Sequence, residues 1–138
     1  MSQELLTSPD RAACAVCADW LGTAPAVSLV AGFAVAAALA GLANGGAPHP
    51  ILLLVPLTIA ERYLAVRLAL DARLFGRLAD GTLGTLDDLD AGLRQVLAVP
   101  ARKAGRPLAQ RIMGARRLHQ WHTATVALMV LMAILAWY

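Results

Sequence analysis

The sequence predicts an all-α membrane protein in which three transmembrane helices carry long cytoplasmic helical extensions, together with one short amphipathic cytoplasmic helix. Three observations lead to this class. Of the 138 residues, 59% are hydrophobic, which is more than an ordinary soluble domain carries. The apolar residues are concentrated in three runs separated by polar segments. Eleven of the twelve basic residues lie between Arg62 and Arg117, and such a bias marks the cytoplasmic side of a membrane protein.

The N-terminal segment is short and polar, and it contains a helix start signal. Thr7 or Ser8 is suited to cap a helix, and Pro9 is favourable at the first helical position. We therefore expect a helix that carries Arg11 to Leu21. This helix precedes the first apolar run and includes both cysteines of the chain.

The first apolar run predicts a transmembrane helix over about residues 24–42. It has nineteen residues without a charge, close to the roughly 20 that are needed to cross the hydrocarbon core. Gly32 and Ala36 recur at a four-residue spacing, and small residues at this spacing let helix backbones approach closely in lipid. We expect Gly32 and Ala36 to form an interface. An alanine-rich helix produces such rows by chance equally often.

The second apolar run leads directly into charged sequence. Asn-Gly-Gly and two prolines in residues 43–50 predict a turn, so that the first two spans are antiparallel neighbours. No glycine or proline falls between Leu57 and Phe75, which predicts one continuous helix from Ile51 to about Asp80. Its membrane part covers about residues 48–63, and its remainder extends into the cytoplasm.

A short amphipathic helix follows. Thr85 and Asp88 form a plausible capping box for a helix that begins at Leu86 and reaches about Val99. Its apolar positions share one face, while its charged positions lie elsewhere. This helix is too short and too charged to span a membrane. We expect its apolar face to be uncovered and to dock a partner through Leu86, Leu89, Leu93 and Leu97.

The last helix is predicted over Leu108 to Tyr138, with residues 121–138 in lipid. The basic middle segment, about residues 64–120, then forms a cytoplasmic helical module of a single domain that covers residues 1–138. The N-terminus is expected inside and the C-terminus outside the cytoplasmic membrane of a bacterium. Three aromatic residues, Trp20, Tyr63 and Trp121, are expected at the inner boundary of the bilayer.

Glu61 and Arg62 are the most informative charged residues, because they interrupt the second span. Counted from Pro50 at about 1.5 Å per residue, Glu61 lies ~16 Å along the helix, near the centre of a ~30 Å hydrocarbon core. An ionisable residue at that depth indicates an ion or proton pathway. Counted from the aromatic residues, Glu61 lies at the headgroup boundary, which is the placement that we favour.

Two pairs of potential metal ligands have a three-residue spacing. Cys14 and Cys17 form one pair, and His119 and His122 form the other. Together they would supply the ligands of a zinc site, and the cysteines alone would suggest redox chemistry. The simpler interpretation has two buried thiols and two imidazoles bonded to lipid headgroups or to Glu61. A haem site would need a second axial ligand at matching depth, and His49 lies at the other side.

Several classes of protein are disfavoured by the sequence. There is no nucleophile elbow, glycine-rich phosphate loop or HExxH motif, so we expect no enzyme, cofactor or metal centre. The basic run has no accompanying nucleic-acid recognition motif. The acids of the Leu86–Asp90 segment are explained as helix-capping residues rather than as metal ligands.

Two functions remain. The first is a non-catalytic subunit or scaffold of a membrane complex, in contact with the bilayer and with another membrane or cytoplasmic protein or a second copy of itself. The alternative is an oligomeric transporter or a proton- or ion-conducting element that uses Glu61, Arg62 and His122. The surroundings of Glu61 distinguish them, because a buried ionisable centre favours transport and an open headgroup position favours a scaffold.

Overall fold

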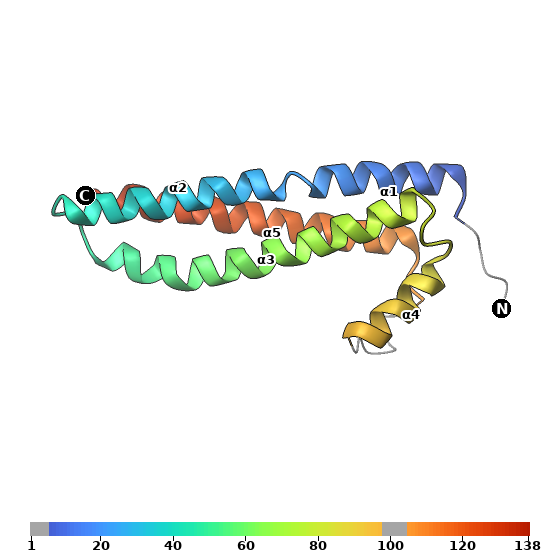
Figure 1. The fold of residues 1–138 in the computed structure, drawn as a ribbon. Helices are drawn as coiled ribbons and strands as arrows, with labels where there is room; N and C mark the ends of the chain where they lie inside the picture. Colours follow the sequence, from blue (N-terminus) through green and yellow to red (C-terminus); the bar gives the residue numbers. More distant parts are fainter. Residues whose placement is uncertain (1–5, 98–104) are drawn as a thin grey trace. The chain divides into compact units, whose positions relative to one another are not determined.

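The computed structural model describes residues 6–97 and 105–138, and within these ranges every element is an α-helix (Figure 1). The all-α prediction is therefore confirmed. The elements in chain order are α1 (Ser8–Leu21), α2 (Ala24–Ala43), α3 (His49–Ala79), α4 (Leu86–Leu97) and α5 (Leu108–Leu135). The expected end of the fourth helix near Val99 lies outside the described residues.

Two helix starts follow the local signals in the sequence. At the start of α1, the Thr7 side chain accepts a hydrogen bond from the Asp10 amide at 3.4 Å, and the Thr7 amide donates to the Asp10 carboxylate at 3.1 Å. Thr85 and Asp88 make the same reciprocal pair before α4, with both distances 3.1 Å. Both predicted caps are confirmed. Each satisfies amide groups that the helix itself leaves without partners.

The chain divides into two compact units. Unit 1 contains the described residues of Met1–Gly22 and Leu70–Arg116, and unit 2 contains Thr23–Ala69 and Arg117–Tyr138. Unit 2 therefore holds α2, the first two thirds of α3 and most of α5. Unit 1 holds α1, the rest of α3, α4 and the start of α5. The segments expected in lipid all belong to unit 2.

Unit 2 is held together by an apolar core to which three helices contribute. Small side chains of α2 pack against Leu54 of α3 and against side chains of residues 126–136. Figure 1 shows α2, α3 and α5 running beside one another. Gly41 lets the backbones meet, because a Cβ there would lie 3.0 Å from the carbonyl oxygen of Ala136. The buried core residues are Ala31, Ala34, Ala38, Leu54, Val126, Met129, Ala133 and Ala136.

The small residues that pack are not the pair singled out in the sequence. Gly32 and Ala36 are exposed, and a Cβ at Gly32 would have no atom within 4 Å. The interface expected at these two residues is therefore absent between the helices of the described chain. Alanine occupies several faces of α2, so the spacing alone did not determine which face packs. A contact of this row with a partner stays a prediction.

By length and composition, two helical segments of the described chain are suited to cross a membrane, rather than the expected three. They are Ser8–Ala43, which contains α1 and α2, and Leu108–Leu135. The third expected span, about residues 48–63 in α3, is not one of these two segments. The physical reason is the composition of α3, in which Glu61 and Arg62 end the apolar run and further charged residues follow.

Unit 1 contains a buried ion pair that links α4 to α5. The Arg111 guanidinium donates to both carboxylate oxygens of Asp90 at 2.8 Å, and the side chains are only 7% (Asp90) and 14% (Arg111) exposed. The Gly105 amide adds a third hydrogen bond to Asp90 at 2.7 Å. Asp88 is a capping residue, as expected, but Asp90 is a structural anchor that the sequence analysis had assigned to capping.

Replacement of Gly41 by leucine should destabilise unit 2 by about 1–3 kcal/mol, the usual cost of overpacking a filled interior. The side chain would meet backbone atoms of Ala136, which cannot rotate away. Gly32→Leu is the matched control in the same helix, because the space around Gly32 is open. Thermal unfolding of both variants in detergent checks this. Equal melting temperatures would contradict the packing described for Gly41.

Asp90→Ala should lower the free energy of unfolding of unit 1 by about 3–5 kcal/mol, because it leaves the Arg111 charge buried without its partner. The exposed Asp87 of the same helix provides the control Asp87→Ala. Hydrogen exchange of α4 amides in both variants measures the effect locally. Equal protection in the two variants would show that the ion pair does not anchor α4.

Candidate functional site

Three polar side chains meet inside unit 2, one from each of its helices. Ser28 comes from α2, Glu61 from α3 and His122 from α5. Glu61 and His122 have no exposed surface, and Ser28 is 8% exposed. Each lies on a helix face that carries mostly apolar side chains. When those faces pack, the three polar groups are enclosed and must satisfy one another.

The three groups converge on one carboxylate oxygen. The Ser28 hydroxyl donates to Oε1 of Glu61 at 2.5 Å. Nε2 of His122 lies 3.1 Å from the same oxygen and 3.4 Å from the Ser28 hydroxyl. Hydrogen bonds to an ionised carboxylate are short and strong. With Nε2 carrying the hydrogen, the arrangement gives Glu61 two donors on one oxygen.

Arg62 supplies a positive charge on the other side of the carboxylate. Its Nε lies 3.2 Å from Oε2 of Glu61, while the Arg62 side chain is 62% exposed. Oε2 of Glu61 nevertheless has no hydrogen-bond partner among the described residues. The contact is therefore an ion pair that lacks the geometry of a hydrogen bond. The guanidinium thus balances the buried charge while most of it stays at the surface of unit 2.

One ring nitrogen of this centre has no hydrogen-bond partner among the described residues. A neutral imidazole that donates from Nε2 leaves Nδ1 as an acceptor. Nδ1 of His122 is buried and has no hydrogen-bond partner in the described part of the chain. His119, the other imidazole of α5, lies near, with the two ring centroids 6.4 Å apart. Glu61 and His122 therefore form a hydrogen-bonded pair with one buried ring nitrogen that has no partner in the described part of the chain.

The structure brings two of the three residues proposed for an ion pathway into the interior and leaves the third at the surface. Glu61 and His122 share a hydrogen bond, whereas Arg62 points outward. The expectation that Glu61 lies open at a headgroup boundary is wrong for its side chain. Its position on α3 turns it toward α2 and α5, and counting residues along one helix could not show this. The expected bond from a histidine to Glu61 is confirmed for His122.

Ser28 was missed in the sequence, although a signal was present. It is the one polar side chain in the run from Ala24 to Leu42. A hydroxyl in an otherwise apolar transmembrane segment generally finds a partner on its own backbone or on another helix. Attention to that single position would have suggested that the first span contributes to the polar centre.

The second pair of possible ligands does not complete a metal site. Among the described residues, no group of three or more histidine, cysteine or acidic side chains is arranged to hold a metal ion. Cys14 and Cys17 are free thiols that are buried in unit 1, as the simpler interpretation expected. Burial raises the pKa of Cys14, with a smaller contribution from Asp10. Burial, Cys14 and Asp71 together raise the pKa of Cys17 to about 11.

The apolar face of α4 is partly covered by the fold itself. Leu89 is buried, and Leu86 and Leu93 are half-buried. The expectation of an uncovered face is therefore wrong at Leu89. The side chain of Leu97 lies outside the described residues. A docking role for the rest of this face stays a prediction, and it would use the edge of the helix rather than Leu89.

Comparison of the chain with protein families, with curated proteins and with solved structures gives no match.

The raised pKa of the two thiols predicts slow alkylation at neutral pH. Only the thiolate reacts, and the pKa of Cys17 at about 11 keeps it protonated. We expect iodoacetamide to modify the folded protein much more slowly than the denatured protein at pH 8, with a rate that rises as the pH increases. Mass spectrometry of tryptic peptides measures this. Equal rates in the folded and denatured protein would contradict the burial of Cys14 and Cys17.

Proposed function

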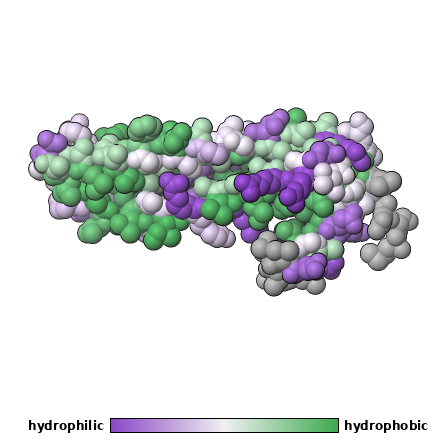
Figure 2. Space-filling model, viewed as in Figure 1, coloured by the Kyte–Doolittle hydropathy of each residue, from purple (hydrophilic) through white to green (hydrophobic). Residues whose placement is uncertain are grey.

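We propose that the protein is an integral membrane protein whose unit 2 lies in the bilayer. The support is the outer surface of this unit, on which large apolar side chains of all three helices are exposed. In Figure 2 the part that holds the α2–α3 turn and the C-terminus is mostly hydrophobic. Apolar patches of this extent mark contact with a membrane or a protein. Examples from the three helices are Leu29, Phe33, Leu52, Ile59, Leu128 and Leu131.

We also propose that the first part of α3 lies in lipid beside α2 and α5. Glu61 lowers the hydropathy of this part of α3, but its side chain is buried against α2 and α5 and does not face lipid. Tyr63 and Trp121 are exposed on α3 and α5, next to the level of the polar centre. Amphipathic rings of this kind lie at membrane–water interfaces. On this basis we propose an inner membrane protein with its N-terminus in the cytoplasm and its C-terminus in the periplasm.

Within this setting, we propose that the protein binds and transfers protons as an element of membrane transport. The observation that carries the proposal is the hydrogen bond between Glu61 and His122 inside unit 2, where Nδ1 of His122 has no partner among the described residues. Ionisable residues enclosed in a membrane bundle are costly, and they commonly form proton relays. Glu61 and His122 share one hydrogen bond, so a proton gained or lost by one of them changes the bonding of the other.

The groups that face the centre define its charge. α2 contributes the neutral Ser28, α3 contributes Glu61 and Arg62, and α5 contributes His122 with His119 nearby. With Glu61 ionised and both imidazoles neutral, Arg62 balances the carboxylate. One added proton then gives the centre a net positive charge. This charge favours release of the proton when the helices move or when a partner accepts the proton.

The apolar core limits the path of the proton. Beyond the centre, the described core of unit 2 consists of alanine, leucine, valine and methionine side chains, which offer a proton no hydrogen-bonded chain. We therefore propose exchange with the end of unit 2 where Tyr63 and Trp121 lie. Passage to the other side then requires a second conformation or the helices of another copy, so the protein is not an open channel.

A scaffold or subunit function remains the second candidate. The exposed apolar side chains Val16 and Met113 of unit 1 favour it, because they lie outside the unit proposed for the bilayer. Recovery of a stoichiometric protein partner in mild detergent, lost on Val16→Asp or Met113→Asp, would support a scaffold. In that case Glu61→Gln should leave the partner bound.

The test of proton transfer uses the protein in liposomes that contain a pH-sensitive dye. We expect proton movement under an imposed pH gradient, and we expect Glu61→Gln or His122→Gln to reduce it to the level of protein-free vesicles. Each variant keeps the size and polarity of the side chain but removes its ability to exchange a proton. Arg67→Gln is the control, because Arg67 is exposed on the same helix and has no contact with the centre.

Thermal unfolding of the same variants separates a structural role from proton transfer. If the centre only fixes the packing of the helices, Glu61→Gln and His122→Gln should lower the melting temperature without changing proton movement per folded molecule. Equal proton movement in the parent and in both variants would overturn the proposal.

A further inference from the structure

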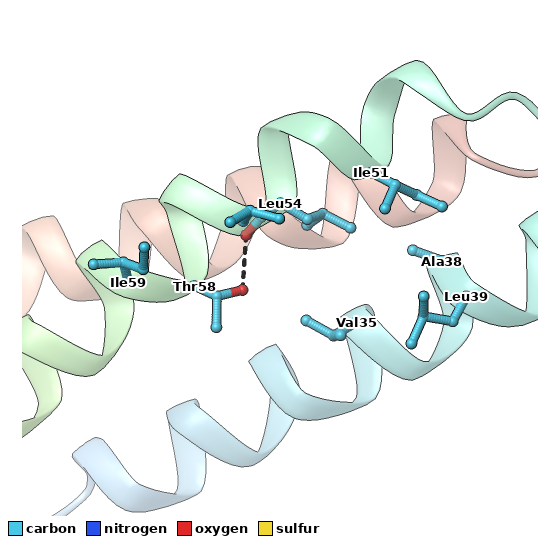
Figure 3. Close-up of a pocket in the computed structure, with 8 residues that line it drawn as sticks. Val35, Ala38, Leu39, Ile51, Leu54, Thr58 and Ile59 are labelled. Atoms are coloured by element: carbon cyan, nitrogen blue, oxygen red, sulfur yellow. Dashed lines mark hydrogen bonds between the residues drawn. The ribbon is translucent and has the colours of Figure 1, made fainter.

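We infer that unit 2 has a seat for one anionic phospholipid, with an acyl chain in a groove between α2 and α3 and its phosphate at Arg62. This inference rests on the proposed membrane location and is independent of proton transfer. The groove encloses about 300 Å³, at the lower end of the range for small-molecule sites. In Figure 3, Ile51, Leu54 and Thr58 lie on one side, and Val35, Ala38 and Leu39 on the other.

The lining is suited to a hydrocarbon chain. Thr58 is the one polar side chain among the lining residues, and its hydroxyl donates to the carbonyl oxygen of Leu54 at 2.7 Å (Figure 3). The lining therefore offers no free side-chain hydrogen-bond donor. The groove also opens to the outer surface of unit 2, since Leu39, Val55 and Ile59 are exposed. A lipid tail gains contacts there without losing any hydrogen bond.

A positive charge lies one helical turn beyond the groove along α3. Arg62 lies three residues after Ile59 and four after Thr58, so the helix places it on the face that lines the groove. Its side chain is 62% exposed, and only Nε is directed to Glu61. A guanidinium has five N–H donors, which leaves the outer ones for the oxygens of a phosphate. The charge at this end is therefore complementary to an anionic headgroup.

The groove is long enough to hold much of an acyl chain. The rise from Ile51 to Ile59 is about 12 Å, and Arg62 lies roughly 4.5 Å further along α3. A phosphate at Arg62 and a chain that extends toward Ile51 thus fit one acyl chain. Tyr63, the exposed neighbour of Arg62, is a residue type that favours the same headgroup depth.

Native mass spectrometry of the protein released from nanodiscs tests the seat. The nanodiscs contain equal amounts of phosphatidylglycerol and phosphatidylcholine, which differ in headgroup charge. We expect one retained phosphatidylglycerol per chain. Arg62→Gln should reduce its retention about fivefold, the effect of roughly 1 kcal/mol for one cation near an anionic lipid. Arg62→Lys should restore most of the preference, whereas Arg67→Gln, on the opposite side of α3, should match the parent.

A second variant tests the groove itself. Val35→Phe fills it and should abolish retention of both lipids, while Val30→Phe, on another face of α2, should retain them. Retention unchanged by both Arg62→Gln and Val35→Phe would overturn the inference. A lipid-free dimer that Val35→Phe dissociates would assign the groove to a second copy and would also overturn it. If the parent protein did not enter nanodiscs, the proposed membrane location would be refuted. If the parent protein retained the lipid but moved no protons in liposomes, only the proposed proton transfer would be refuted.

Discussion

A carboxylate enclosed in an apolar helical unit must find partners, and this constraint organises unit 2. Burial of an unpaired charge costs several kcal/mol, so the helices that enclose Glu61 must also supply donors. Ser28 of α2 and His122 of α5 do this from two sides, and both approach the same oxygen. A shift of either helix by one turn would remove a donor. The polar contacts therefore fix the register of helices whose apolar surfaces alone permit several arrangements.

Arg62 connects the interior of unit 2 with its surface. Its Nε faces the carboxylate of Glu61, while most of the side chain is exposed, one helical turn beyond Thr58 and Ile59 of the α2–α3 groove. The same cation thus balances the buried charge and offers donors to a phosphate. The two contacts use different nitrogens of the guanidinium, since Nε faces Glu61 and the outer N–H groups are directed to solvent.

Local features of the fold were predictable from the sequence, and features that depend on packing were not. The caps at Thr7 and Thr85 involve residues three apart, so short patterns were sufficient to locate them. The inward direction of Glu61 depends on the rotation of α3 relative to two other helices. Counting residues along α3 gives the position of Glu61 along the helix but not this rotation. Asp90 illustrates the same limit, because its partner Arg111 is 21 residues away in the chain. The packed face of α2 was ambiguous, since Ala31 and Ala36 are chemically equivalent.

The most direct test of the central claim is the protonation of His122, followed by nitrogen-15 NMR of histidine-labelled protein in nanodiscs. We expect Nε2 to carry the hydrogen that is shared with Glu61, and we expect Nδ1 to gain a proton as the pH is lowered. Glu61→Gln should change this transition, because it removes the charge to which His122 is coupled, whereas Arg67→Gln should preserve it. A transition that is identical in the parent and in Glu61→Gln would contradict the existence of a coupled proton-binding pair.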